Sequence, residues 1–157
     1  MRRNSTDYAG ILCANSLDSL NNWLQYDYVG APWSPNSRFG GNGGLSLRRI
    51  SPIIQILRQQ SRIPHTDPED VWLSSRLGHR PGAVVANGSE SVRFSAENIW
   101  HEDPMPMGYH TGSSGKILPG GIWGEEAKRE KIWKWVGWKS WMKGDDADRG
   151  HVGIVLR

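Results

Sequence analysis

The sequence contains a single cysteine, Cys13, among its 157 residues. One thiol can form neither an internal disulfide nor a cysteine-based zinc site. No apolar stretch approaches the roughly 18 residues that a membrane-spanning helix needs, and the apolar segment of a signal peptide does not follow Met1-Arg2-Arg3. The sequence therefore gives no support for a disulfide-stapled, zinc-ribbon or membrane-spanning protein. Cys13 lies in a short apolar run and is predicted to be buried.

An excess of one charge sign is also absent. The chain carries 19 Lys and Arg against 16 Asp and Glu, a net charge of +3, and both signs are interspersed. This balance does not favour nucleic acid as a partner. Tryptophan, by contrast, is plentiful, with nine copies. Its large ring stacks on sugars in sugar-handling proteins, although core packing is the commoner role of any single tryptophan.

Strand and helix patterns alternate along the chain, which predicts an α/β fold. The segments expected to be extended are Tyr8–Ala14, Tyr26–Ala31, Gly43–Arg48, Ala83–Ala86 and Met105–His110. Those expected to be helical are Ser16–Leu24, a helix opened by Ser51-Pro52, a helix opened by Asp67-Pro68 that ends at Gly78, and Glu125–Trp135. The pattern of Ser91–Trp100 is ambiguous between helix and strand.

The capping and burial patterns of the two central helices follow simple rules. Ser51 is expected to cap the first helix, with Pro52 in its first turn, where the missing N–H costs nothing. Its buried stripe is predicted to be Ile53, Ile54 and Leu57. In the second helix we expect the buried residues to be leucines one turn apart, Leu73 and Leu77.

Two segments about twenty residues apart are the strongest candidates for chemistry. The first is the glycine-rich Gly41–Arg49, in which glycine permits positive φ and close approach to a ligand. The second contains the adjacent carboxylates Glu69 and Asp70, either of which could take a proton from a hydroxyl group. Each has a structural alternative, since the first is also an ordinary tight turn and the second is also a well-formed helix start.

Two further sets of residues are candidates for binding. Asp7 and His110 could converge on a divalent cation, because hard oxygen ligands suit magnesium or manganese and histidine favours manganese; the alternative is that both are surface polar groups. The aromatic tail Trp133–Trp141 is mixed with lysines, which is compatible with a helix at a membrane surface. The alternative is that Ile132, Trp135 and Val136 pack on the core.

Six ordered segments together resemble a known family. These segments are Thr6–Cys13, Tyr26–Trp33, Gly41–Arg48, Pro68–Val71, Phe94–Glu97 and Pro106–His110. They are similar to the C-terminal part of a family of uncharacterised, mainly fungal proteins that itself resembles GT-A glycosyltransferases. The resemblance extends from about Thr6 to about Trp135. It implies a GT-A-like mixed sheet flanked by helices, and metal-assisted transfer of a sugar from a nucleotide-sugar donor to a hydroxyl acceptor.

The resemblance also implies roles for individual residues. Asp70 would be the catalytic base, with Glu69 as its partner, and Asp7 and His110 would hold a divalent cation, manganese or magnesium. The remaining residues would contact the substrates: Trp33, Asn42, Gly43 and Gly44.

Because only six residues precede Asp7, the resemblance implies a domain over residues 1–136 that lacks its N-terminal nucleotide-binding strands, followed by a divergent or disordered tail over 137–157. Such a chain is expected to expose a sheet edge that a partner chain covers. The alternative to a transferase is a non-catalytic fragment that binds glycan or protein.

Overall fold

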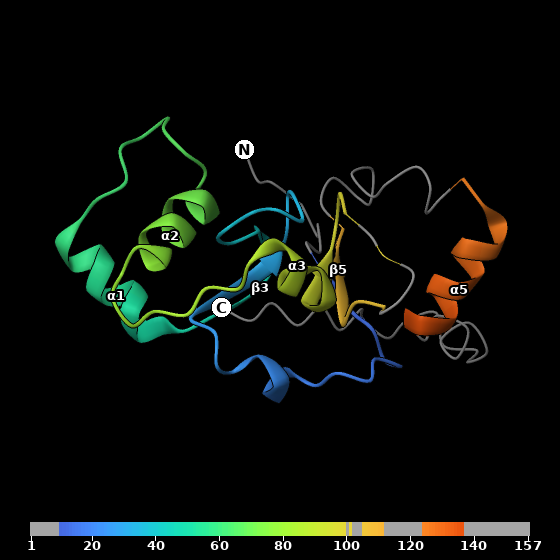
Figure 1. Cartoon of the computed structure of the whole chain (residues 1–157). Coiled ribbons are helices and arrows are strands. Elements are labelled where there is room, and N and C mark those ends of the chain that lie inside the picture. The colour runs from blue at the N-terminus through green and yellow to red at the C-terminus, as the bar shows by residue number, and fades with distance from the viewer. Residues whose placement is uncertain (1–9, 100, 102–104, 112–123, 137–157) are drawn as a thin grey trace, which may run out of the picture.

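The computed structural model of the chain describes residues 10–99, 101, 105–111 and 124–136. This part of the chain contains four α-helices, one short 3-10 helix and five strands. The protein is therefore mixed α/β, as the alternation of patterns predicts. Figure 1 shows the strands in the middle of the molecule, with helices α1 (Ile50–Gln59) and α2 (Glu69–Gly78) at one end and α5 (Glu126–Val136) at the other.

The described strands form two small sheets. In the first sheet, β5 (Gly108–His110) lies between β1 (Gly10–Leu12) and β4 (Ser95–Ala96). It is antiparallel to β1 and parallel to β4, so this sheet is mixed. The register places Gly10 opposite His110, which brings the first described residue of the chain beside one of the predicted site residues.

The second sheet is an antiparallel pair of β2 (Tyr28–Ala31) and β3 (Asn42–Arg48), which confirms both predicted strands to within two residues. A Cβ atom on Gly30 would collide with a carbonyl oxygen of β3, so a glycine is required where the two strands approach. The two sheets meet at Leu45, because a Cβ atom on Gly10 would lie only 2.7 Å from the Leu45 Cβ.

Helix α2 ends where its sequence predicts, but Pro68 and not Asp67 occupies the N-cap position, without a side-chain cap. It begins at Glu69, directly after Pro68, and ends at Gly78. Leu73 and Leu77 are both buried, together with Ile53 and Ile56 of α1. Burial of this leucine pair anchors α2 against α1 and fixes where its N-terminus lies.

The predicted stripe of α1 is wrong in two of its three members. Ile53 is buried, but Ile54 and Leu57 are 41% and 55% exposed, and Ile56 is buried in their place. Four of the five residues from 53 to 57 are apolar, so a helical period does not choose between two faces. The choice is made by the partner helix, whose Trp72 joins the same buried cluster.

The start of α1 also differs from the prediction. Arg49, with an extended backbone, occupies the N-cap position and accepts no helix N–H through its side chain. Ser51 is therefore already inside the helix. Pro52 remains in the first turn, where no backbone partner is needed for the missing N–H.

Other predicted elements are also shorter than expected: β5 covers only the last three residues of Met105–His110, and β1 ends at Leu12 rather than Ala14. The helix predicted over Ser16–Leu24 is only the 3-10 helix η1 (Leu20–Trp23). The strand predicted over Ala83–Ala86 is an isolated parallel bridge between Val85 and Tyr28. The residue after Val85 still bonds to β2, because the Ala86 N–H donates to the Tyr28 carbonyl at 3.0 Å.

The ambiguous segment after residue 87 divides into helix α3 (Gly88–Phe94) and strand β4. Asn87 caps α3: its side-chain oxygen accepts the Glu90 N–H at 3.0 Å, while the Glu90 carboxylate accepts the Asn87 N–H at 2.9 Å. This reciprocal capping box fixes the start of the helix. Helix α3 then leads directly into β4 and the segment after it.

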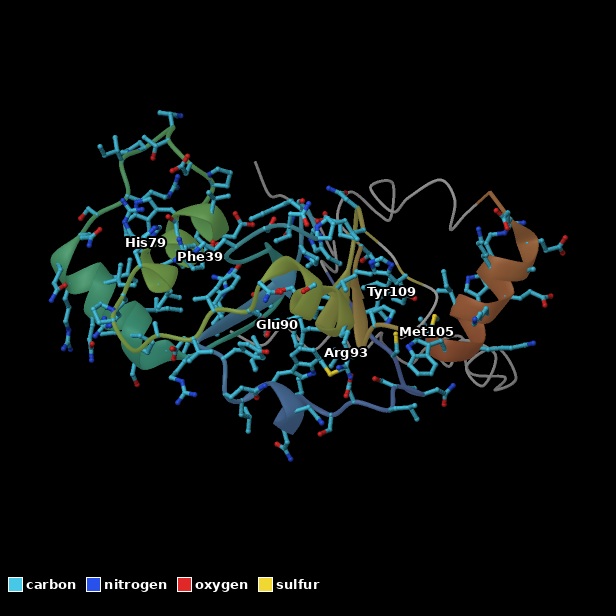
Figure 2. The ribbon with its side chains drawn as sticks, in the orientation of Figure 1. Phe39, His79, Glu90, Arg93, Met105 and Tyr109 are labelled. Atoms are coloured by element: carbon cyan, nitrogen blue, oxygen red, sulfur yellow. The ribbon has the colours of Figure 1, made fainter. Side chains whose placement is uncertain are left out.

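Helix α5 packs on the first sheet, which confirms its core role. Ile132 is buried with Cys13, Ala96 and Tyr109, and Trp135 and Val136 pack against that cluster. Figure 2 shows Tyr109 and Met105 on the side of β5 that faces α5. Burial raises the pKa of the Cys13 thiol to about 12, in agreement with its predicted place in the core.

The described helices include none with the length and apolar character required to cross a membrane. Trp133 is 39% exposed. Two more tryptophans of the predicted aromatic tail, Trp138 and Trp141, lie outside the described residues, as does the whole segment 137–157.

Candidate functional site

The glycine-rich turn and the acidic pair, far apart in the sequence, meet in the structure. The backbone N–H of Gly43 donates to Oδ2 of Asp70 at 2.9 Å. The other carboxylate oxygen of Asp70, Oδ1, accepts the N–H of Val71 at 2.8 Å. Asp70 therefore ties the start of β3 to the first turn of α2 and has both oxygens engaged by backbone donors.

Glu69 is held by a cation. Two guanidinium nitrogens of Arg48 donate to the Glu69 carboxylate, the longer of the two bonds being 3.3 Å. The Arg48 guanidinium also lies 5.2 Å from the centre of the Tyr28 ring. Burial opposes the charge of Arg48, but the bonds to Glu69 and the neighbouring charges outweigh it and raise the pKa of the guanidinium. Glu69 and Arg48 therefore form an ion pair beside Gly43.

The absence of a side chain at Gly43 favours this arrangement. A Cβ atom there would collide with the Arg48 guanidinium and would lie 3.2 Å from the Asp70 Cβ. Glycine is the residue that lets the strand backbone come this close to the helix start. The positive φ expected in this glycine-rich segment occurs at Gly40 and not at Gly43, and the groups that lie close to Gly43 are side chains of the protein itself, Asp70 among them.

A pocket of about 410 Å³ opens beside Gly43 and Glu69. Most of its wall is apolar, supplied by α1 and α2, and its polar groups lie near the glycine-rich strand. The lining residues are Gly43, Ser46, Arg48, Ile50, Ile53, Leu57, Arg62, Glu69, Trp72 and Leu73. A small molecule with an apolar part could be enclosed here with its polar end near Glu69.

A second constellation is buried on the other side of the glycine-rich turn. Nδ1 of His110 lies 2.6 Å from Oε1 of Glu97, and the two residues are only 6% and 2% exposed. Asn42 donates from Nδ2 to the same Glu97 oxygen at 3.4 Å, and its Oδ1 accepts the Gly44 N–H at 2.9 Å. Asn42 therefore connects the pair to the turn.

The second carboxylate oxygen of Glu97 has no hydrogen-bond partner among the described residues. This oxygen, Oε2, is buried. A histidine whose one ring nitrogen is held by a carboxylate presents the other nitrogen in a fixed direction, which is the usual arrangement of a metal-bound histidine. A buried acceptor without a donor is costly, and its presence marks this position as one that a ligand could complete.

The sequence matches a known family model. The family described as "Protein of unknown function (DUF5672)" matches residues 6–110, which is more than half of the chain. The chain belongs to this family. No curated protein and no solved structure matches it.

The DUF5672 match contains every residue singled out above. It begins one residue before Asp7 and ends at His110, so the glycine-rich turn, the acidic pair and the Glu97–His110 pair all lie inside it. Helix α5 lies outside the match, although it packs on the matched part. The site residues thus belong to the region that defines the DUF5672 family.

The structure brings together six of the eight residues that the sequence suggested. They are Asn42, Gly43, Gly44, Glu69, Asp70 and His110. Trp33 is 36% exposed and does not line the pocket beside Gly43, and Asp7 lies outside the described residues.

Glu97 was missed as a site residue, although Phe94–Glu97 was among the segments that carried the family resemblance. The sequence feature that could have indicated Glu97 is its place directly after the short strand β4, which follows the apolar Phe94. The structure adds what that signal lacked: its partners are Asn42, 55 residues before it, and His110, 13 residues after it.

The fit of this site to a divalent cation rests on His110. Among the residues that the structure describes, no group of three or more His, Cys, Asp or Glu side chains could hold a metal ion. The described residues therefore supply one oriented nitrogen donor and a buried carboxylate with one unbonded oxygen. The second predicted ligand, Asp7, is three residues before Gly10, which the β1–β5 register places opposite His110.

Proposed function

We propose that this DUF5672 protein is a glycosyltransferase-like protein of GT-A type, which transfers a sugar from a nucleotide-sugar donor to a hydroxyl acceptor with the help of a divalent cation. One observation carries the proposal. Two adjacent residues of one turn, Asn42 and Gly43, bond to Glu97 and to Asp70 respectively. A buried carboxylate–histidine pair and an acidic pair therefore lie on either side of a glycine-rich backbone.

The acidic pair would act on the acceptor. Asp70 is the proposed base, because each of its oxygens retains a lone pair after accepting one backbone N–H. Those two bonds fix the carboxylate in one orientation, which is what proton transfer at hydrogen-bond distance requires. Glu69, at the mouth of the apolar pocket, would accept a hydrogen bond from a neighbouring acceptor hydroxyl while Arg48 balances its charge.

The histidine side would serve the donor. His110 is the described residue that would hold the cation, together with Asp7 on the strength of the resemblance. Such a cation neutralises the charge of a diphosphate leaving group. Glu97 orients His110 through its 2.6 Å contact with Nδ1, and the lack of a side chain at the exposed Gly44 leaves room for a bound sugar.

The test is release of nucleoside diphosphate from a panel of nucleotide sugars with manganese, compared between the wild-type chain and Asp70→Asn. Asparagine can accept only one of the two backbone N–H groups, so folding stability is measured in parallel. We expect turnover to fall by at least about a hundredfold for Asp70→Asn, the scale of general-base catalysis. Glu69→Gln is the matched neighbouring control, with a smaller loss. Turnover unchanged in Asp70→Asn would refute the base assignment.

A second function, that of a non-catalytic binding module, is favoured by a different observation. Both oxygens of Asp70 and the carboxylate of Glu69 are already engaged within the protein, as expected of acids that hold structure together. In that case no nucleotide sugar is turned over and nucleoside diphosphate with manganese leaves the melting temperature unchanged. Glycans or alkyl alcohols that enter the pocket of about 410 Å³ would still raise it.

A further inference from the structure

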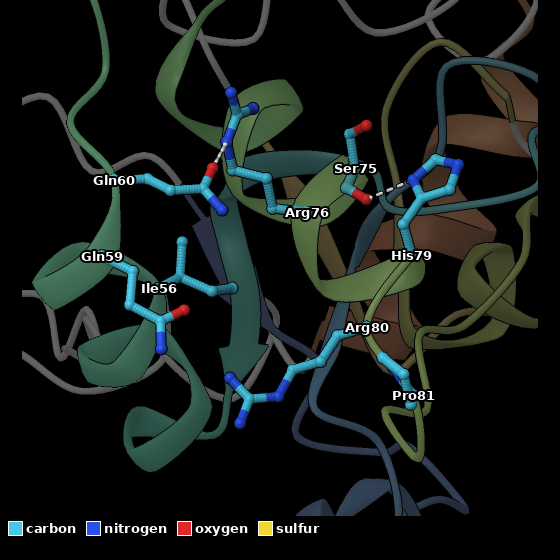
Figure 3. Close-up of a pocket in the computed structure, with 8 residues that line it drawn as sticks. All are labelled: Ile56, Gln59, Gln60, Ser75, Arg76, His79, Arg80 and Pro81. Atoms are coloured by element: carbon cyan, nitrogen blue, oxygen red, sulfur yellow. Dashed lines mark hydrogen bonds between the residues drawn. The ribbon is translucent and has the colours of Figure 1, made fainter.

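A larger pocket lies between α1 and α2, outside the site described above. It has a volume of about 690 Å³ and is drawn in Figure 3. Its lining residues are Ile56, Gln59, Gln60, Ser75, Arg76, His79, Arg80 and Pro81. Two of these are arginines and none is acidic, so the pocket is lined by hydrogen-bond donors and positive charge.

The two arginines of this pocket lack acidic partners among the described residues. Other arginines of the chain do have them: Arg48 pairs with Glu69, Arg49 with Asp27 at 2.8 Å, and Arg93 with Asp18 at 3.5 Å. Arg76 and Arg80 have no carboxylate within 4 Å in the part of the chain that the structure describes.

Asp27, an acid that lines a hollow together with Arg80, already has partners. Its Oδ1 is bound by Arg49 and its Oδ2 accepts the Val84 N–H at 2.8 Å. The positive charge of Arg80 is therefore available to a ligand.

Both guanidinium groups are held in place before any ligand arrives. Arg76 lies 3.9 Å from the centre of the Trp72 ring, and its Nε donates to Oε1 of Gln60 at 2.7 Å; Figure 3 shows this bond across the pocket. Arg80 donates through Nη2 to Oε1 of Gln55. Fixing the side chains in advance reduces the entropy lost on binding. The other N–H groups, at Nη2 of Arg76 and at Nε and Nη1 of Arg80, have no described acceptor.

The helix dipoles oppose an anion here but do not prevent its binding. The pocket adjoins the C-terminal ends of α1 and α2, each of which carries roughly half a negative charge in its free carbonyl groups. Several of these carbonyls are occupied. The Ser75 carbonyl accepts the ring Nδ1 of His79 at 2.7 Å, and the Ile56 carbonyl accepts the Gln60 N–H at 2.8 Å. The two full charges of Arg76 and Arg80 therefore dominate.

We infer that this pocket binds the phosphate group of a small soluble phosphate ester. Guanidinium groups recognise phosphate through paired N–H donors, and two further polar residues, Gln59 and Ser75, line the same pocket. The volume of about 690 Å³ exceeds that of a bare phosphate. Ile56 and Pro81 supply apolar surface for the organic part.

The experiment uses phenyl phosphate as the probe and phenol as its uncharged counterpart, titrated calorimetrically into the full chain. We expect phenyl phosphate to bind and phenol not to bind. Arg80→Gln should weaken binding by about tenfold or more, the worth of one charge-assisted hydrogen bond. Arg80→Lys keeps the charge but not the planar donor pair, and we expect its affinity for phenyl phosphate to lie between those of wild type and Arg80→Gln. Melting temperatures of all variants report whether each is folded.

The matched control is Arg58→Gln, which removes an equal charge from an exposed position of α1 that does not line the pocket. Its affinity should remain within about twofold of wild type, because charges separated by water are screened at physiological salt. The inference is overturned if phenyl phosphate does not bind, if phenol binds equally well, or if Arg80→Gln and Arg58→Gln weaken binding to the same extent.

Discussion

Glu97 is an acidic residue that is buried in the protein. It is a carboxylate that is only 2% exposed, with one oxygen shared by His110 and Asn42 and the other without a described donor. Burial of a carboxylate is unfavourable unless polar groups compensate for the lost water. Its partners come from β5 and β3, so Glu97 also joins the two sheets.

The coupling between Glu97 and His110 can be measured by a double-mutant cycle. We predict that Glu97→Ala lowers the free energy of unfolding by about 1 to 3 kcal/mol, because it leaves His110 and Asn42 without their acceptor. Alanine at both 97 and 110 should cost less than the sum of the single changes by at least about 0.5 kcal/mol. Urea denaturation supplies all the values.

The control for this cycle is the exposed pair Glu125–Lys128, at 2.8 Å on the surface near α5. Its coupling energy should be about 0.5 kcal/mol or less, since water and salt weaken exposed ion pairs. Equal coupling in the two pairs would show that burial does not strengthen the contact between Glu97 and His110.

At the scale of elements, α2 is attached to β3 by two adjacent carboxylates that make different contacts. Asp70 accepts N–H groups from Gly43 and Val71, whereas the neighbouring Glu69 makes a half-exposed ion pair with Arg48. We predict that Asp70→Ala destabilises the chain by about 1 to 3 kcal/mol, because two backbone donors lose their acceptor. Glu69→Ala should cost about 0.2 to 1 kcal/mol. Chemical denaturation of the two variants gives the comparison.

This comparison also bears on the proposed base. If Asp70→Ala and Glu69→Ala cost the same, Asp70 has no special structural role, and any loss of turnover in Asp70→Asn is then chemical in origin. A larger cost for Asp70→Ala means that activity of its variants has to be measured under conditions in which each variant is fully folded.

The sequence was sufficient for elements whose signals are local. Helix α2 begins after a proline and ends at a glycine. Strand β2 ends just before Pro32, and strand β3 begins in the glycine-rich segment. These boundaries were therefore predicted closely. The stripe of α1 was not predictable in the same way. Both of its faces carry isoleucine or leucine, and contact with α2 decides which face is buried.

The candidate site was predictable only in its local parts. The glycine-rich turn and the acidic pair stand out as short segments, whereas the contact between them joins residues 27 apart. Glu97 became a candidate only when its contacts with Asn42 and His110 were known. Short-range sequence patterns indicate which residues are candidates for a site, but long-range packing decides which of these residues come into contact.

At the scale of the whole molecule, the folded unit is larger than the family match. The match ends at residue 110, yet α5 is held to the matched part by several contacts. Nε1 of Trp135 donates to the Pro106 carbonyl at 2.8 Å, and Asn15 bonds through its side chain to the Lys134 carbonyl at 2.5 Å. The first sheet therefore relies on α5 to cover its apolar face.

The dependence of the fold on α5 can be tested at two adjacent positions. Ile132 is 5% exposed and packs with Cys13, Ala96 and Tyr109, whereas Trp133 is 39% exposed. We predict that Ile132→Ala lowers the free energy of unfolding by about 2 to 5 kcal/mol, because a buried aliphatic side chain is lost and a cavity remains. Trp133→Ala, which removes a larger side chain, should cost less. Urea denaturation followed by circular dichroism measures both, and a greater loss for Trp133→Ala would mean that α5 does not dock on the sheet through Ile132.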